Sequence, residues 1–190
     1  MSPQAEARSE PVRQGRSCRS EAEYVMKSPE VPSTPAVRLL RERGIPFRPH
    51  FYDYEEKGGT AHAAASVGIP EHRVVKTLVM EDEERRPLIV LQHGDRQVST
   101  KRLARLLGVK KVQPCDPATA QRHTGYMVGG TSPLGTRRPL PVYAERTVLE
   151  LESIALNGGR RGLLVEVAPG DLLGVLHITA VEAATDEDRD

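Results

Sequence analysis

Short apolar runs recur along the chain between turn-forming residues, a pattern that predicts a sheet with short helices around it. The longer runs are typical of strands because they are rich in β-branched residues or alternate with polar ones. They occupy residues 47–54, 74–80, 88–91, 140–144 and 163–167. Shorter runs predict further strands at residues 111–112, 126–128, 154–156 and 178–179. We expect the run at 126–128 to be a buried strand that ends in a glycine bend.

Capping residues mark helices between these strands. Ser33 or Thr34 before Pro35 predicts a helix that stops at Gly44. Further helices are expected at residues 60–67, 100–107, 117–123 and 169–176, with a helical turn at 146–151. Helices and strands interleave irregularly, and at least one connection reads as a hairpin. The predicted fold class is therefore mixed α/β, a sheet flanked by helices, and not a regular βαβ repeat.

The chain of 190 residues has the length of one domain with tails. Residues 1–33 are too polar to offset the entropy of ordering, which predicts a disordered extension. Residues 34–180 are predicted to form the domain. Residues 181–190 are predicted to be an acidic tail, because the segment 182–190 contains five acids against Arg189 alone.

Composition narrows the classes of function. The charged fraction is 28%, but the formal net charge is only +1, so the whole chain has no strong electrostatic signature. No window approaches the roughly 18 consecutive apolar residues of a membrane helix, and the N-terminus lacks the apolar core of a signal peptide. Cys18 and Cys115 fit no disulfide or zinc spacing, and the histidines form no i,i+4 pair or compact cluster. We expect a cytoplasmic, reduced protein without a metal site or a cofactor.

Positive charge is concentrated around the helix predicted at residues 100–107. Leu103, Leu106 and Leu107 form its predicted apolar face, and the segment 99–111 has five basic residues and no acid. These residues are Lys101, Arg102, Arg105, Lys110 and Lys111. Such a cluster is usually a solvated face, but it also suits contact with a nucleic-acid backbone.

The stretch TGYMVGGTSPLG at residues 124–135 contains four glycines in twelve residues. Gly129 and Gly130 permit backbone angles barred to other residues, and their peptide N–H groups are not covered by side chains. Ser132 follows and is biased toward an extended conformation by Pro133. This bend could hold a carbonyl or a phosphate oxygen, although glycine pairs are more often plain turns.

Two single residues have a less common setting. Lys76 lies inside the apolar strand at 74–80, where an ammonium group is costly to bury unless an anion meets it. The alternative is that Lys76 points to solvent while its neighbours point inward. Tyr52 lies near the end of the strand at 47–54, where an aromatic side chain usually only packs.

Taken together, several segments resemble the YbaK/EbsC family of aminoacyl-tRNA deacylases, specifically its Cys-tRNA(Pro) deacylase branch. In chain order they are TPAVRLL, residues 47–54, VVKTLV, STKRLARLLGVKKV, TGYMVGGTSPLG and NGGRRGL. The resemblance covers about residues 34–179, roughly three quarters of the chain. It implies a mixed, partly barrel-like sheet of six or seven strands surrounded by helices, similar to the editing domain of prolyl-tRNA synthetases.

The resemblance also implies a site. The family's best-known functional residue is a lysine that matches Lys76, and a tyrosine of the preceding strand matches Tyr52. The catalytic residues implied are Lys76, Gly129 and Gly130. The substrate contacts implied are Tyr52, Thr131, Ser132, Pro133, Asn157, Gly158 and Gly159. The contacts to tRNA expected are Lys101, Arg102, Arg105, Lys110, Lys111, Arg137, Arg138, Arg160 and Arg161.

The sequence offers no persuasive enzyme nucleophile. In the branch that the chain resembles, the thiol of the bound cysteine attacks its own carbonyl, which implies a substrate-assisted hydrolase or lyase. The partners implied are aminoacylated tRNA and prolyl-tRNA synthetase, with no membrane and no DNA.

Two departures from the family pattern keep alternatives open. Asn157 replaces a serine, and Leu164 replaces an acidic or polar residue. The amino acid removed could therefore be alanine or serine instead of cysteine, or the chain could bind tRNA or a synthetase without catalysis. A role in small-molecule or cell-wall chemistry is a third alternative, and it predicts no salt-sensitive affinity for tRNA.

Overall fold

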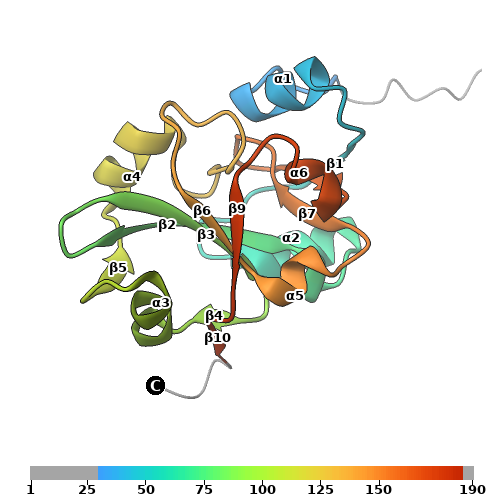
Figure 1. Ribbon diagram of the computed structural model, residues 1–190. Coiled ribbons are helices and arrows are strands. Elements are labelled where there is room, and N and C mark those ends of the chain that lie inside the picture. The colour runs from blue at the N-terminus through green and yellow to red at the C-terminus, as the bar shows by residue number, and fades with distance from the viewer. Residues whose placement is uncertain (1–29, 186–190) are drawn as a thin grey trace, which may run out of the picture. The chain divides into compact units, whose positions relative to one another are not determined.

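The computed structural model describes residues 30–185, and the largest sheet in this part of the chain has five strands (Figure 1). Its strands, in spatial order, are β5 (Val112–Pro114), β2 (Val75–Asp82), β3 (Pro87–His93), β6 (Val142–Glu145) and β9 (Ile178–Val181). β2 is antiparallel to β3 and β5, whereas β6 is parallel to β3 and β9. The predicted mixed α/β class is confirmed.

The other strands form two smaller sheets instead of extending the first one. A three-stranded antiparallel sheet has the order β1 (Arg48–Phe51), β8 (Leu163–Val167) and β7 (Ile154–Asn157). β10 (Ala184–Thr185) pairs with β4 (Gln97–Val98). A single β-bridge joins Val74, the residue before β2, to Ala155 of β7. Within the described residues, the sheets therefore do not close into a barrel.

β3 contributes to the core on both of its faces. Ile89 and Leu91 pack in the larger apolar cluster, with the helix after Thr34 and the three-stranded sheet, whereas Leu88 and Val90 pack in the smaller one. This division follows from the alternation of side chains along a strand. It explains why the apolar run at 88–91 is continuous, because both faces of a central strand are covered.

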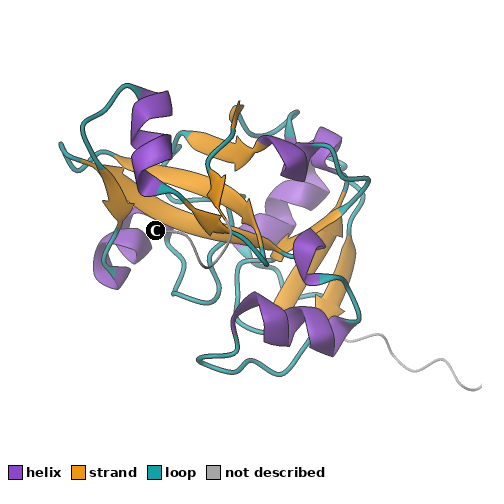
Figure 2. Cartoon of the chain, turned by 90° about the horizontal axis from the view of Figure 1, so that it is seen from below, coloured by secondary structure: helices purple, strands orange, loops and turns teal. Residues whose placement is uncertain are grey.

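Helices lie on either side of the strands, as Figure 2 shows. They are α1 (Pro35–Glu42), α2 (Gly59–Val67), α3 (Thr100–Leu107), α4 (Pro117–Thr124), α5 (Arg146–Leu149), α6 (Pro169–Leu172) and the 3-10 turn η2 (Glu71–Arg73). The predicted caps are present at three of these helices: the side chains of Thr34, Ser99 and Asp116 accept hydrogen bonds from backbone N–H groups of the first turn, at 3.1, 3.3 and 2.9 Å. Each cap satisfies a donor that the helix cannot satisfy itself.

The predicted strand at residues 126–128 is wrong. Tyr126 is buried, and its hydroxyl donates to the carbonyl of Leu134 at 2.7 Å, but Met127 and Val128 are 57% and 51% exposed. The segment pairs with no strand in the described part of the chain and forms a loop that leads into the glycine bend. The buried side chain of Tyr126 and the hydrogen bond of its hydroxyl fix this segment. Backbone hydrogen bonds to a neighbouring strand do not.

Three smaller expectations also change. Leu106 is 53% exposed, so the buried face of α3 is made by Leu103 and Ala104. The helix expected at 169–176 ends at Leu172. The fold continues past the expected boundary at residue 180, because Val181 and Ala183 are buried before β10. Residues 1–29 of the predicted extension and 186–190 of the predicted tail lie outside the described residues.

Candidate functional site

A pocket of about 530 Å³ opens along an uncovered edge of β2. β5 pairs with β2 only from Met80 onward, and β7 reaches it only through the bridge at Val74. Residues 75–79 between these contacts line the pocket. The other walls come from α2, the start of α4, the glycine bend and the segment after β1. This volume suits a small organic ligand, for which pockets of about 300–1,000 Å³ are usual.

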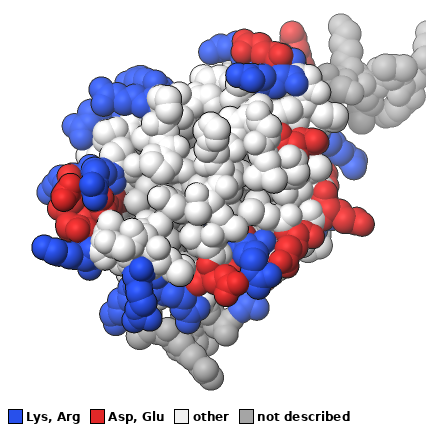
Figure 3. All heavy atoms as spheres, viewed as in Figure 1, with Lys and Arg blue, Asp and Glu red and all other residues white. Residues whose placement is uncertain are grey.

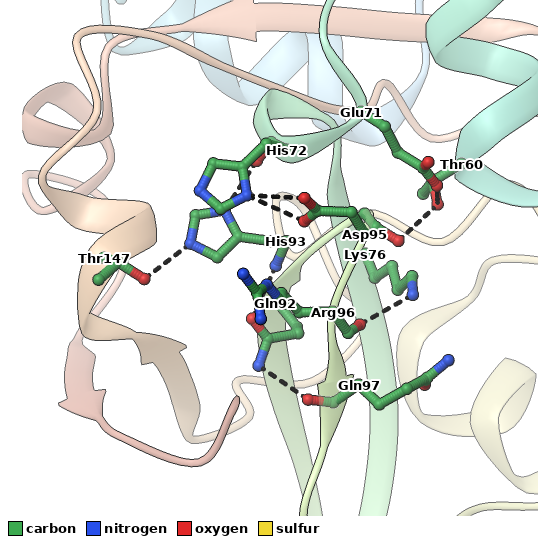
Figure 4. Close-up of polar contacts among 11 residues, drawn as sticks. Thr60, Glu71, His72, Lys76, Gln92, His93, Asp95, Arg96, Gln97 and Thr147 are labelled. Atoms are coloured by element: carbon green, nitrogen blue, oxygen red, sulfur yellow. Dashed lines mark hydrogen bonds and ion pairs between the residues drawn. The ribbon is translucent and has the colours of Figure 1, made fainter. Parts of the chain in front are cut away.

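Lys76 lines this pocket and supplies a positive charge to it. Its ammonium donates to the backbone carbonyl of Arg96 at 2.9 Å, as Figure 4 shows. No carboxylate of residues 30–185 lies within ion-pairing distance of it. A lysine has three N–H donors, so the carbonyl occupies one of them and leaves the charge unneutralised. Such a group can bind a phosphate or a ribose oxygen.

Gly129 lies on the wall of the same pocket, in a conformation that favours glycine. Its φ is +83°, and a Cβ at this position would lie 2.6 Å from the hydroxyl of Tyr54. Gly130 is buried, and its N–H donates to the carbonyl of Met127 at 2.9 Å. The N–H of Gly130 is therefore already used, contrary to the expectation that both glycines present bare N–H groups. Among the described residues, the N–H groups of Gly129 and Thr131 have no such partner, and both residues line the pocket.

Of the residues that follow the two glycines in the first bend, one lines the pocket and the others are buried. Thr131 lines the pocket, whereas Ser132 and Pro133 are buried and do not. The hydroxyl of Ser132 accepts a hydrogen bond from the N–H of Leu134 at 3.3 Å. Ser132 therefore supports the shape of the bend from inside the protein and does not line the pocket.

Asn157 joins the two glycine turns. Its side-chain amide donates to the carbonyl of Gly129 at 2.9 Å, and its side-chain oxygen accepts from the N–H of Gly159 at 2.8 Å. Asn157 also lines the pocket, but Gly158 and Gly159 do not. A Cβ on Gly159 would come 3.0 Å from the ring of Tyr126, so these glycines allow close packing under the site. Asn157, which stands where the family pattern has serine, thus fixes the carbonyl of Gly129 in the bend.

Tyr52 lines the pocket and also the groove beside it. Burial raises the pKa of its hydroxyl, which keeps the group protonated at neutral pH and able to donate a hydrogen bond. Leu164 lies in the pocket wall and is 4% exposed. Because it stands where the family pattern has an acidic or polar residue, it makes this wall apolar.

Sequence reasoning missed six lining residues with polar side chains. They are Tyr54, Glu55, Glu56, Thr60, Thr77 and Cys115. Burial, followed by the nearby carboxylate of Glu81, raises the pKa of the Cys115 thiol to about 11. The thiol is therefore not ionised at neutral pH. No sequence signal marked these residues, because they reach the pocket through tertiary packing from four separate segments.

The expected tRNA contacts lie on the surface, outside the pocket. Lys101, Arg102 and Arg105 are exposed on α3, and basic side chains gather at the lower margin of the face in Figure 3, whereas the centre of that face is uncharged. Lys110, Lys111, Arg137 and Arg138 are also exposed.

Arg160 and Arg161 line a groove of about 840 Å³ that shares Tyr52 and Tyr54 with the pocket. The guanidinium of Arg161 lies 4.7 Å from the centre of the Tyr54 ring and donates to the carbonyl of Val128 at 2.9 Å. These two arginines are the basic residues that the structure brings next to the pocket.

The expectation that the histidines form no compact cluster is wrong for His72 and His93. Their rings stack with centres 3.7 Å apart, and Nδ1 of His72 contacts the carboxylate of Asp95 at 2.9 Å. Nδ1 and Nε2 of His93 are both engaged, with the His72 carbonyl and the Thr147 hydroxyl. One ring nitrogen from each histidine and a carboxylate oxygen of Asp95 lie within 4.8 Å of one another, close enough to hold a metal ion. The same groups form a hydrogen-bonded support, which borders the turn that holds Lys76.

Comparison with known proteins assigns this arrangement to a family. The model of the aminoacyl-tRNA editing domain matches residues 55–175, which include β2 and both glycine turns. EbsC of Enterococcus faecalis, named provisionally as a Cys-tRNA(Pro)/Cys-tRNA(Cys) deacylase, is 29% identical over 155 residues, 81% of this chain and 94% of EbsC. A proline–tRNA ligase of Desulfovibrio desulfuricans is 35% identical over 81 residues, 43% of this chain and 14% of the ligase.

A solved structure has the same fold. It is described, again provisionally, as a trans-editing enzyme for prolyl tRNA synthetase, and it superposes with a TM-score of 0.68 at 23% identity, over 82% of this chain and 99% of that one. Residues 30–185 contain no helix long and apolar enough to cross a membrane.

Proposed function

The chain belongs to the family of aminoacyl-tRNA editing domains, and we propose that it is a trans-acting deacylase that removes cysteine from mischarged tRNA(Pro). One observation carries this proposal: Lys76 and Gly129 line the same pocket. A single ligand can therefore meet an ammonium group on one side and a glycine bend on another. A terminal nucleotide esterified to an amino acid presents the complementary groups, which are phosphate and ribose oxygens next to an ester carbonyl.

Each lining residue has a role that follows from its contacts. Lys76 binds phosphate or ribose oxygens of the terminal nucleotide. The N–H groups of Gly129 and Thr131 polarise the ester carbonyl, and the protonated hydroxyl of Tyr52 orients the aminoacyl group. Asn157 holds the bend in place through its hydrogen bond to the carbonyl of Gly129. Positioning of this kind can contribute on the order of 7–11 kcal/mol to lowering a barrier.

The nucleophile in this proposal belongs to the substrate. The Cys115 thiol is protonated at neutral pH, and no histidine lines the pocket among the described residues. Among the described residues, no imidazole is hydrogen-bonded to the hydroxyl of a lining threonine or tyrosine, although the centre of the His62 ring lies 6.2 Å from that of the Tyr52 ring. The thiol sulfur of the bound cysteine attacks its own carbonyl carbon, the bond from that carbon to the ribose oxygen breaks, and the ribose oxygen takes up the thiol proton. The products are a cyclic thioester and uncharged tRNA.

Alanine is the second candidate for the amino acid removed. The wall of the pocket around Leu164 is apolar, with Ala63 and Val79 also on it, and such a wall accepts a methyl group. Because alanine has no thiol, its removal requires water or a ribose hydroxyl as the nucleophile.

The tRNA body would be held by weak, non-sequence-specific contacts. The exposed residues of α3 and the arginines of the groove beside the pocket can meet backbone phosphates. The partial match to proline–tRNA ligases supports prolyl-tRNA synthetase as the candidate partner that delivers the charged tRNA.

A panel of aminoacyl-tRNAs tests the proposal. Purified protein is incubated with cysteinyl-, alanyl-, seryl- and prolyl-tRNA(Pro), and the loss of each ester is followed over time. We expect cysteinyl-tRNA(Pro) to be cleared and prolyl-tRNA(Pro) to be spared. Lys76→Ala should slow the reaction roughly 10- to 100-fold, the equivalent of about 1.5–3 kcal/mol for a hydrogen bond to a charged group. Clearance of alanyl-tRNA with cysteinyl-tRNA spared would refute the thiol mechanism, and undiminished activity of Lys76→Ala would remove the lysine from the site.

A further inference from the structure

We propose that the turn between β3 and β4, residues 94–96, positions the ammonium group of Lys76, and that Thr60 fastens this turn to the wall of the pocket. The expected effect on deacylation rests on the proposed function, whereas the positioning of Lys76 by the turn does not. It concerns residues that lie outside the glycine turns and that no sequence pattern marked.

The first step is the contact between the turn and the lysine. The carbonyl of Arg96 accepts a hydrogen bond from Nζ of Lys76 at 2.9 Å (Figure 4). A free lysine side chain has four flexible carbon–carbon bonds and samples many rotamers. A fixed acceptor selects the rotamers that direct the remaining N–H donors along the edge of β2. If the carbonyl moves, the ammonium group loses this fixed direction.

The second step is the attachment of the turn. The Thr60 hydroxyl has a single proton, which is shared between the carbonyl of Gly94 at 3.0 Å and the carboxylate of Glu71 at 2.8 Å. A Cβ on Gly94 would come 2.5 Å from the carbonyl oxygen of Glu71, so the turn packs directly on the backbone of η2. Asp95 adds a second attachment through its bonds to Nδ1 of His72, at 2.9 and 3.0 Å.

The third step is the rigid base under the turn. His93 is 1% exposed and stacks on His72, and its Nε2 lies 2.7 Å from the hydroxyl of Thr147. Gln92 is the cross-strand partner of Lys76, and its side chain accepts from the N–H of His93 and donates to the carbonyl of Gln97. The turn is thus held by buried or half-buried hydrogen bonds of Thr60, Gln92 and His93 and by an exposed contact between Asp95 and His72.

Like Lys76, Thr60 both lines the pocket and bonds the turn, so it connects the pocket wall to the turn that holds the lysine. We therefore assign it as a positioning residue that acts through Lys76. Thr60→Val keeps the shape of the side chain and removes the hydroxyl, and Thr60→Ser restores the hydroxyl. Thr179→Val, at an exposed position of β9, is the matched control.

A labelling experiment tests the structural part without substrate. The protein is treated briefly with acetic anhydride, and the acetylation rate of each lysine is measured by mass spectrometry. In Thr60→Val we expect Lys76 to be acetylated at least threefold faster, because its ammonium form loses a fixed acceptor, whereas the rates of Lys57 and Lys110 stay unchanged. An unchanged rate at Lys76 would overturn the proposal. Asp95→Ala, at an exposed position, should give a change in the same direction if Thr60→Val does not fold.

A double-mutant cycle tests the kinetic part. Thr60→Val should lower kcat/KM for cysteinyl-tRNA(Pro) about tenfold, and Thr60→Ser should stay within twofold of the wild type. In the Lys76→Ala background, Thr60→Val should have less than a twofold effect, because its target is gone. Equal losses in both backgrounds would show that Thr60 acts independently of Lys76. If the wild type deacylates no charged tRNA, the proposed function fails, while the labelling result still decides the role of the turn.

Discussion

Asn157→Ala is expected to damage the site through the backbone of the glycine bend. The substitution removes two hydrogen bonds, one to the carbonyl of Gly129 and one from the N–H of Gly159. At about 1 kcal/mol net for each bond, the free energy of unfolding should fall by about 2 kcal/mol. For a chain of this size that is a decrease in Tm of about 4–8 °C. The activity should fall about tenfold or more, because the carbonyl of Gly129 is freed at the pocket wall.

The assay combines thermal unfolding with deacylation kinetics on the same preparations. Asn157→Asp separates the two bonds, because it keeps the acceptor for Gly159 and places a carboxylate oxygen against the carbonyl of Gly129. It should lose as much activity as Asn157→Ala. Asn157→Ser introduces the residue usual in the family and should retain part of the activity. A Tm within 1 °C of the wild type together with unchanged kcat/KM in Asn157→Ala would refute this account of the turn.

Three further predictions concern charge and protonation. Cys115→Ser should keep kcat/KM within about twofold of the wild type, since a thiol with a raised pKa is not the nucleophile; a loss of a hundredfold would contradict this. Burial lowers the pKa of His93, so the unfolded chain binds the proton more readily than the folded one. The Tm of the wild type should therefore fall as the pH drops below about 6.5, and the Tm of His93→Gln should fall less. Arg160→Ala should reduce the slope of log affinity for tRNA against log salt by about 0.7–0.9, whereas replacement of the similarly exposed Arg43 should leave the slope unchanged.

Local chemistry made much of the fold predictable. The caps at Thr34, Ser99 and Asp116 act on N–H groups three residues away, so the sequence alone identifies them. β8 is antiparallel to β7, which agrees with the expectation that at least one connection is a hairpin. The expected strand at 126–128 failed because its short apolar run packs through Tyr126 alone, and nothing local reveals that no partner strand lies beside it.

The sequence pointed to residues that line the pocket but not to the contacts that support them. Lys76 and Gly129 were both identified, and they line one pocket. The acceptor for Lys76 is a backbone carbonyl twenty residues away, and Asn157 bonds a carbonyl 28 residues away. A backbone carbonyl has no sequence signature, because every residue has one. The burial of Ser132 likewise depends on how the bend packs, which its neighbours in sequence do not determine.

The most direct test is the binding of an amide-linked cysteinyl-adenosine, a stable analogue of the charged tRNA end, followed by NMR. The account predicts that the backbone amide signals of Gly129 and Thr131 and the side-chain signals of Lys76 shift together along one binding curve. Binding that shifts the signals of Lys76 and leaves those of Gly129 and Thr131 in place would contradict it.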